Sequence, residues 1–315
     1  MPLDSEHSAS RANRRDNAVF ARVMLVLPGD PAYRAAAARE AEFWARASST
    51  DVFTSAFELG SVLQAAANRT LTGDERTTWL DDLMARGPFE HAAVLGCTDG
   101  VFELPWIRAR ASQALDVFDL SEEVIARLAA RAQPEAGGCE VRFACADLNF
   151  VKLAPRTYDV VWSSGCLHHV INLEYLFDQV AAALRPGGLF AFQDYVGERR
   201  LRFAPERLRL VNAVLMRVPA RYRRTTDLVE LPSLDGASPF CAVRSDEVLA
   251  VARARFHPVH VALGGALYPL AAYLDLATLE REAPEVLEEV VRAESRAGAD
   301  PAIRPVAAYA VFRRD

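Results

Sequence analysis

Residues 92–100 read AAVLGCTDG, and about twenty positions later residues 113–119 read QALDVFD. Each stretch is a short apolar run followed by small or acidic residues, a pattern typical of a buried strand that ends at a ligand-binding edge. Glycines after a first strand let the backbone approach a ligand, and a carboxylate ending the next strand accepts hydrogen bonds from ribose hydroxyls. The glycine loop and the carboxylate together predict an adenosine ligand. The spacing of the glycines here is G-x-x-x-G, which differs from the dinucleotide fingerprint G-x-G-x-x-G, so the ligand need not carry a pyrophosphate.

The same alternation of short apolar runs and helical patterns continues along the chain. The expected strands lie at 92–95, 113–118, 141–144, 160–162 and 189–192, with two more near 259–262 and 306–312. The expected helices around them lie at 121–132, 173–184, 205–218 and 245–255. Strands that alternate with helices in this way predict an α/β fold, here a doubly wound, mostly parallel, seven-stranded Rossmann-like sheet.

The composition excludes several classes of protein. With 315 residues, 51% of them hydrophobic, the chain can form a sizeable core, and its net charge of −6 disfavours nucleic acid as a partner. The five cysteines include no C-x-x-C pair, so we expect neither a disulfide framework nor a metal site. We see no secretory leader and no apolar run of membrane-spanning length, which together predict a cytoplasmic protein without a membrane partner.

Five segments in the right order resemble class I S-adenosylmethionine-dependent methyltransferases. They are AAVLGCTDG at 92–100, FDLS at 118–121, CADL at 145–148, YDVVWSSGCLHH at 158–169 and LRPGGLF at 184–190. The resemblance covers roughly residues 92–196, and QDYVGERR at 193–200 is similar to a bacterial subgroup that acts on small molecules. It implies S-adenosylmethionine as the cofactor.

The resemblance also assigns residues to the cofactor. It places Asp119 on the ribose and Asp147 near the adenine amino group. The full set that it implies for cofactor binding is Gly96, Thr98, Asp99, Gly100, Asp119, Leu120, Asp147, Leu148 and Ser163. Each carboxylate alone also fits a helix cap or a turn, so their joint appearance behind successive strands is what favours the binding role.

Two positions depart from the family pattern. Val94 stands where the family has an acidic residue that helps to hold the methionine ammonium, and Thr98 stands where it has a middle glycine. The amino-acid end of the cofactor is therefore expected to be held differently, with Asp99 contributing.

The candidate catalytic residues follow strands four and five. His168 and His169 are candidate general bases, and Asp194 and Tyr195 are candidates for orienting an acceptor or contacting the sulfonium. Packing or capping is an equally open role for the histidines, and a strand-end hydrogen-bonded pair is the alternative for Asp194 and Tyr195.

We divide the chain into five segments. They are a disordered arm (1–17), a helical N-terminal lid (18–87), the S-adenosylmethionine-binding core (88–196), a helical and loop insertion for substrate (197–244), and a C-terminal completion of the sheet with extra helices (245–315). The lid is inferred from aromatic residues that a free-standing polar helix would not need, including Tyr33, Phe43, Trp44 and Phe57.

The predicted function is methyl transfer to oxygen or nitrogen of a small organic acceptor, in a biosynthetic pathway of specialised metabolism. One alternative is intramolecular cyclisation of S-adenosylmethionine to azetidine-2-carboxylate and methylthioadenosine, which the changed Val94 and Thr98 motivate. A noncatalytic protein that binds S-adenosylmethionine is a third reading. Whether the chain forms a homo-oligomer is left open.

Overall fold

The computed structural model describes residues 25–47, 61–97, 100–135, 137–225, 228–231 and 238–315. The expected arm at 1–17, Phe57 of the expected lid, and the site residues Thr98 and Asp99 lie outside the described residues.

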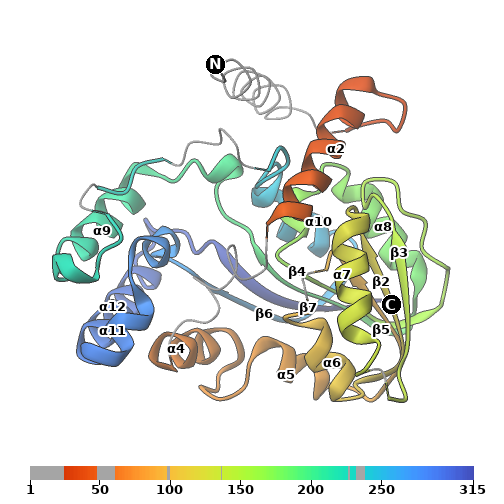
Figure 1. The fold of residues 1–315 in the computed structure, drawn as a ribbon, viewed down its shortest axis with the longest axis horizontal. Helices are drawn as coiled ribbons and strands as arrows, with labels where there is room; N and C mark the ends of the chain where they lie inside the picture. The colour runs from red at the N-terminus through yellow and green to blue at the C-terminus, as the bar shows by residue number, and fades with distance from the viewer. Residues whose placement is uncertain (1–24, 48–60, 98–99, 136, 226–227, 232–237) are drawn as a thin grey trace.

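A single seven-stranded sheet forms the centre of the molecule (Figure 1). The strands are β1 (Phe89–Leu95), β2 (Ser112–Asp119), β3 (Glu140–Cys145), β4 (Tyr158–Ser164), β5 (Leu184–Tyr195), β6 (His257–Gly264) and β7 (Ala307–Arg313). Their order is β3-β2-β1-β4-β5-β7-β6, with β1 to β5 parallel and β7 antiparallel to both of its neighbours. The expected fold class is confirmed.

Strand β1 shows why the apolar runs became strands. Ala92 and Val94 are buried in the hydrophobic cluster on one face of the sheet, and Ala93 and Leu95 are buried in the cluster on the other. A strand that is covered on both faces has no solvent side, so it reads as a continuous apolar run.

Helices cover both faces of the sheet. They are α2 (Pro31–Arg46), α4 (Ser61–Thr72), α5 (Trp79–Met84), α6 (Glu103–Arg108), α7 (Glu122–Ala132), α8 (Leu173–Ala183), α9 (Pro205–Leu215), α10 (Val248–Arg253), α11 (Leu276–Glu282) and α12 (Pro284–Gly298). Helices α8 and α10 pack in the cluster on one face, and α5, α6 and α7 pack in the cluster on the other. Helices α9, α11 and α12 form a further cluster at the opposite end of the molecule from α7 and α8 (Figure 1).

Four local expectations change. Helix α6 was not expected. Helix α9 ends at Leu215, three residues before the expected end at 218. The helix expected at 245–255 is a 3₁₀ turn, η4 (Ser245–Glu247), followed by α10. Strand β5 begins at Leu184, before the expected run at 189–192, and its pairing with β4 shifts register between Tyr158 and Val160. The glycines at 187 and 188 therefore lie inside an irregular start of the strand.

The N-terminal helices do not act as one unit. Tyr33 and Ala36 of α2 are buried against Ile171 and Phe240, near the carboxyl ends of the strands. Helix α4 instead contacts β6 and α12. Within the segment expected to form a lid (18–87), α2 therefore lies near the strand ends and α4 lies beside β6 and α12. None of the described helices has the length and apolar character needed to cross a membrane.

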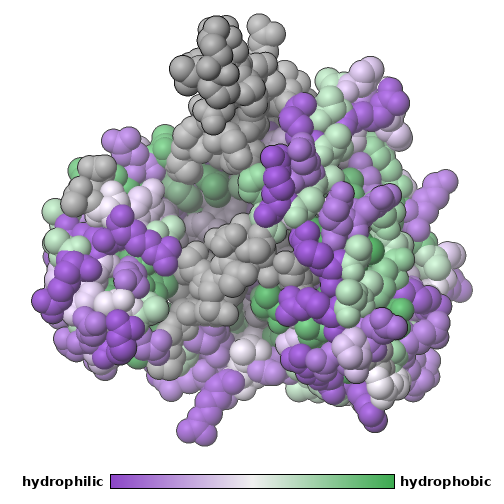
Figure 2. All heavy atoms as spheres, viewed as in Figure 1, coloured by the Kyte–Doolittle hydropathy of each residue, from purple (hydrophilic) through white to green (hydrophobic). Residues whose placement is uncertain are grey.

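Hydrophilic side chains cover much of the face seen in Figure 2, and apolar ones show between them at scattered places.

Candidate cofactor and acceptor site

A cavity follows the carboxyl ends of four neighbouring strands, where the strand order reverses between β1 and β4. Open α/β sheets bind ligands at this point, because the chain leaves the adjacent strands in opposite directions. The cavity is lined from the sheet by Gly96, Cys97, Asp119, Leu120, Asp147, Leu148, Asn149, Ser164, Gly165, Cys166 and His169, and from elsewhere by Glu40, Trp44, Ala47, Val124, Arg127, Val170 and Phe240.

Gly96 lets two strand ends approach each other at the floor of the cavity. Its φ is +74°, and a Cβ atom there would lie 2.2 Å from Sγ and 2.5 Å from Cβ of Cys166. Only glycine fits both the backbone conformation and the space. Gly100, in contrast, does not line the cavity, and a Cβ there would lie 2.7 Å from the side chain of Leu104. We therefore assign Gly100 to the packing of α6.

Asp119 ends β2 with its carboxylate at the cavity wall. Oδ2 accepts a hydrogen bond from the backbone N–H of Cys97 (3.0 Å), and Oδ1 accepts one from that of Ser121 (2.8 Å). Burial raises the pKa of Asp119, although both N–H donors oppose the rise. The carboxylate is thus oriented by the loops after β1 and β2, and it can accept further hydrogen bonds from a ligand.

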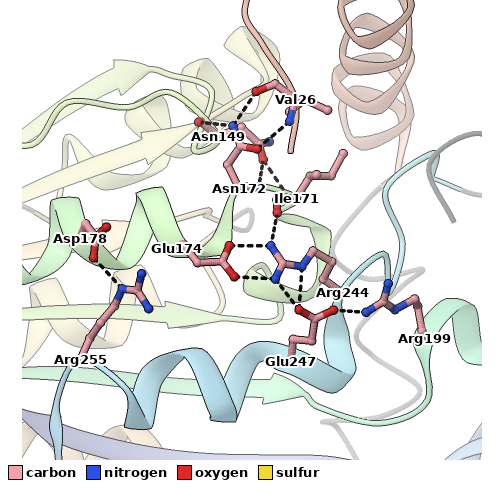
Figure 3. A network of polar contacts seen from close by, with 10 residues as sticks. All are labelled: Val26, Asn149, Ile171, Asn172, Glu174, Asp178, Arg199, Arg244, Glu247 and Arg255. Atoms are coloured by element: carbon pink, nitrogen blue, oxygen red, sulfur yellow. Dashed lines mark hydrogen bonds and ion pairs between the residues drawn. The ribbon is translucent and has the colours of Figure 1, made fainter. Parts of the chain in front are cut away.

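Asp147 follows β3 and is connected to α2. Its Oδ2 accepts a hydrogen bond from the Tyr33 hydroxyl (2.7 Å), which in turn accepts one from Nδ2 of Asn149 (2.8 Å). Oδ1 of Asn149 accepts from the backbone N–H of Asn172, whose side chain exchanges two hydrogen bonds with the backbone of Val26 (Figure 3). This network ties the chain before α2 to the strand ends.

His168 and Asp194 form a hydrogen-bonded pair beside the cavity. Nδ1 of His168 lies 2.5 Å from Oδ1 of Asp194, whose side chain is fully buried. Asp194 also accepts hydrogen bonds from the backbone N–H groups of Leu167 and Tyr195 (both 2.7 Å). Burial opposes the charged form of the ring, but attraction to Asp194 and the hydrogen bond between them raise the pKa of His168 to about 10.

His169 turns to a different carboxylate. Its Nδ1 lies 2.9 Å from Oε1 of Glu40, which α2 brings into the site, and 3.0 Å from the hydroxyl of Ser238. Burial, together with the neighbouring positive charge of His168, lowers the pKa of His169. Adjacent histidines therefore differ in charge, because each ring faces a different carboxylate and the two rings lie 4.1 Å apart between centroids.

The cavity lining leaves out five of the predicted site residues that the structure describes: Gly100, Ser163, His168, Asp194 and Tyr195. Ser163 is fully buried and donates a hydrogen bond to the carbonyl oxygen of Leu95 (2.7 Å), so its side chain is used between β4 and β1. Tyr195 donates to the carbonyl oxygen of Glu198 (3.1 Å) and packs near His168, with 6.0 Å between ring centroids. We expected Ser163 at the cofactor, and the structure instead places Ser164 in the lining.

Sequence reasoning missed the residues that come from outside the sheet. Glu40, Trp44 and Phe240 line the cavity, although they lie far along the chain from the motifs after β1 to β4. The sequence alone marks Trp44 only as an aromatic residue of the expected lid. The one signal that could have pointed to Glu40 is an acidic residue inside an otherwise apolar helical stripe, at the spacing of Tyr33 and Ala36.

Residues 93–188 match the family model of a methyltransferase domain. A curated relative, 27-O-demethylrifamycin SV methyltransferase of Amycolatopsis mediterranei (strain S699), is 29% identical over 135 residues. The match covers 41% of this chain and 48% of that protein, so the chain spans about half the length of the relative.

Two solved structures share the fold. One is geranyl diphosphate C-methyltransferase from Streptomyces coelicolor A3(2), with 16% identity, a TM-score of 0.55, and coverage of 92% of this chain and 100% of that one. The other is a geranyl diphosphate methyltransferase in complex with GPP and sinefungin, with 16% identity, a TM-score of 0.52, and coverage of 89% and 100%.

Proposed function

We propose that the chain is a class I S-adenosylmethionine-dependent methyltransferase that transfers the methyl group to a hydroxyl of a small organic acceptor in a biosynthetic pathway. The observation that carries the choice of a hydroxyl is the contact between His168 and the buried Asp194. A hydroxyl is a weak nucleophile at neutral pH and benefits from a base, whereas a neutral amine needs only desolvation and alignment.

The cavity fits the cofactor by its floor and its charges. Gly96 opens the floor to a close ligand, and Asp119 and Asp147 stand at the ends of neighbouring strands, where ribose and adenine would be held. When bound, S-adenosylmethionine supplies a methyl group on a positively charged sulfur. The chain itself must exclude water and align the acceptor, and we assign the closing of the cavity to α2.

The base is assigned to His168. Its Nδ1–H donates to Asp194, so in the unprotonated ring the lone pair lies on the opposite nitrogen, Nε2, which takes the proton from the hydroxyl of the acceptor. The buried carboxylate then stabilises the imidazolium that forms. Tyr195 lies beside His168 and is assigned to positioning of the acceptor.

The names of the relatives support a small organic acceptor. The curated relative is named for a substrate that lacks a methyl group on an oxygen, and a structural relative is named as a C-methyltransferase of geranyl diphosphate.

The test combines S-adenosylmethionine with a panel of hydroxyl-bearing small molecules and follows products by mass spectrometry. We expect S-adenosylhomocysteine and a methylated acceptor, and His168→Ala should lower turnover by about 10² to 10⁴ while the affinity for S-adenosylhomocysteine is kept. His257→Ala is the matched control, because that exposed histidine on β6 pairs only with Asp315 among the described contacts.

Two results would contradict the proposal. Near-full turnover in His168→Ala would exclude base catalysis by this residue. Methylthioadenosine formed without an acceptor would instead support the cyclisation of S-adenosylmethionine.

A further inference from the structure

Glu40 joins three distant segments at the cavity wall. It is 3% exposed, and its carboxylate accepts hydrogen bonds from Nε1 of Trp44 (2.7 Å), the hydroxyl of Ser238 (2.7 Å) and the backbone N–H of Phe240 (3.0 Å). With Nδ1 of His169 at 2.9 Å, four donors surround it. Burial opposes ionisation, but attraction to His169 and the hydrogen bonds from His169, Ser238 and Phe240 lower the pKa of Glu40.

This contact fixes the orientation of His169. A carboxylate can only accept, so Nδ1 of the imidazole carries the proton and donates it to Glu40. In the neutral ring the lone pair then lies on Nε2, and His169 is part of the cavity lining. The carboxylate behind the ring increases the basicity of that nitrogen. The wall therefore presents a hydrogen-bond acceptor with a negative charge behind it.

The position of His169 along the cavity identifies the part of the ligand that it meets. The lining follows the strand order, with Asp147 after β3, Asp119 after β2, Gly96 after β1 and His169 after β4. If adenine and ribose lie over β3 and β2, the amino-acid end of the ligand lies over β1 and β4.

Among the residues that the structure describes, the sheet places no carboxylate at that end of the cavity. Val94, two positions before Gly96, is fully buried and uncharged. Besides His169, the described lining residues at and after the ends of β1 and β4 are Gly96, Cys97, Ser164, Gly165, Cys166 and Val170, and none of them is a carboxylate. An ammonium group taken from water into such a site requires an acceptor and a compensating charge. Glu40 and His169 supply both.

We propose that the Glu40–His169 pair binds the α-ammonium group of S-adenosylmethionine, with Nε2 of His169 as the direct acceptor and Glu40 as the positioning residue. The inference rests on the proposed function only for the identity of the cofactor. An ammonium site on Glu40 and His169 would replace the acidic residue that Val94 lacks. Because Glu40 lies on α2, this helix would then take part in cofactor recognition.

The test compares three ligands by calorimetry. S-adenosylmethionine has both an ammonium and a sulfonium, S-adenosylhomocysteine has only the ammonium, and methylthioadenosine has neither. Glu40→Gln and His169→Phe should each lower the affinity for S-adenosylmethionine and S-adenosylhomocysteine by ten- to hundredfold and leave the affinity for methylthioadenosine unchanged. Glu42→Gln, on the same helix but with an exposed side chain, should change none of the three affinities.

Each other pattern overturns the inference. An equal loss for all three ligands means that the pair only shapes the cavity, a loss confined to S-adenosylmethionine means that it meets the sulfonium, and unchanged affinities mean that it meets neither. Melting curves identify a variant that has lost its fold. The binding data of the other variant then test the inference. The unaltered chain tests the identity of the cofactor separately. If the unaltered chain does not bind S-adenosylhomocysteine at all, both the proposed function and this inference are wrong.

Discussion

At the scale of single residues, the adjacent histidines show how position in a turn decides chemistry. His168 and His169 have similar burial, with side chains 14% and 11% exposed, yet their pKa values move in opposite directions. The 3₁₀ turn η1 (Leu167–His169) directs one ring to Asp194 and the other to Glu40. The sequence motif marks both residues, and only the carboxylate partners distinguish them.

The pKa of His168 predicts an alkaline shift of the pH profile. A base must be unprotonated to act, so kcat/KM should rise with pH toward the folded pKa of about 10, above the ordinary histidine range. Asp194→Asn removes the attraction that holds the proton, so the rising limb should move to lower pH while the maximal rate falls. If the rising limb of the pH profile lies at the same pH in the unaltered chain and in Asp194→Asn, the His168–Asp194 pair does not control the reaction.

Gly96 predicts a steric effect that can be separated from backbone strain. Gly96→Ala places a Cβ against Cys166, whereas Gly187→Ala has a similar φ of +78° with no atom within 4 Å of its Cβ. Both variants pay about 1 kcal/mol for the left-handed backbone, and Gly96→Ala should lose about 2 kcal/mol more from overpacking. Urea unfolding measures the difference, and equal free energies of unfolding would mean that the approach of β1 and β4 is not tight.

At the scale of elements, Arg244 connects the segment after residue 238 to the core. Its guanidinium is fully buried, bonds both oxygens of Glu174 on α8 (2.7 Å each) and the carbonyl oxygen of Ile171 (2.8 Å), and pairs with Glu247 (Figure 3). Because Phe240 lies only four residues earlier, this network also supports the cavity wall.

Replacement of Arg244 should therefore destabilise the protein strongly. Arg244→Met leaves two carboxylates and a carbonyl without their buried donor, at a cost of about 3 kcal/mol. The control is Arg255→Met, which removes a pair with the exposed Asp178 on the same helix α8 and should cost less than about 1 kcal/mol. Equal shifts in the denaturation midpoint would contradict a structural role for the buried network.

The elements were predictable to different degrees. Strands β1 to β4 were expected within a few residues. For β1 and β4 the reason is burial on both faces, which leaves an apolar run that local sequence shows directly. Helix α6 was missed because its six residues, ELPWIR, are too few to show a helical period and contain a proline. Ser163 was misplaced because successive strand residues face opposite sides, and only the structure tells which side holds the ligand.

The candidate site was predictable only in part, for a reason of distance along the chain. Asp119 and Asp147 follow strands whose order a motif fixes, so both could be assigned to the cavity in advance. Glu40 meets His169 and Phe240 across 129 and 200 positions, and no local pattern reports such contacts.

At the scale of the whole molecule, three additions are joined to one sheet. The sheet supplies the floor and two carboxylates, α2 supplies Glu40 and Trp44, and the segment after residue 238 supplies Phe240. Helices α9, α11 and α12 form their own cluster beside β6 and β7, so the C-terminal part completes the fold with few side chains in the cavity.

The most direct test of the central claim is calorimetric titration of S-adenosylhomocysteine into the unaltered chain and into Asp119→Ala. The unaltered chain should bind one equivalent, and loss of the ribose contact should weaken binding about a hundredfold. Asp178→Ala, which removes an exposed carboxylate on α8, should bind as the unaltered chain does. Unchanged affinity in Asp119→Ala would contradict the assignment of the cavity to S-adenosylmethionine.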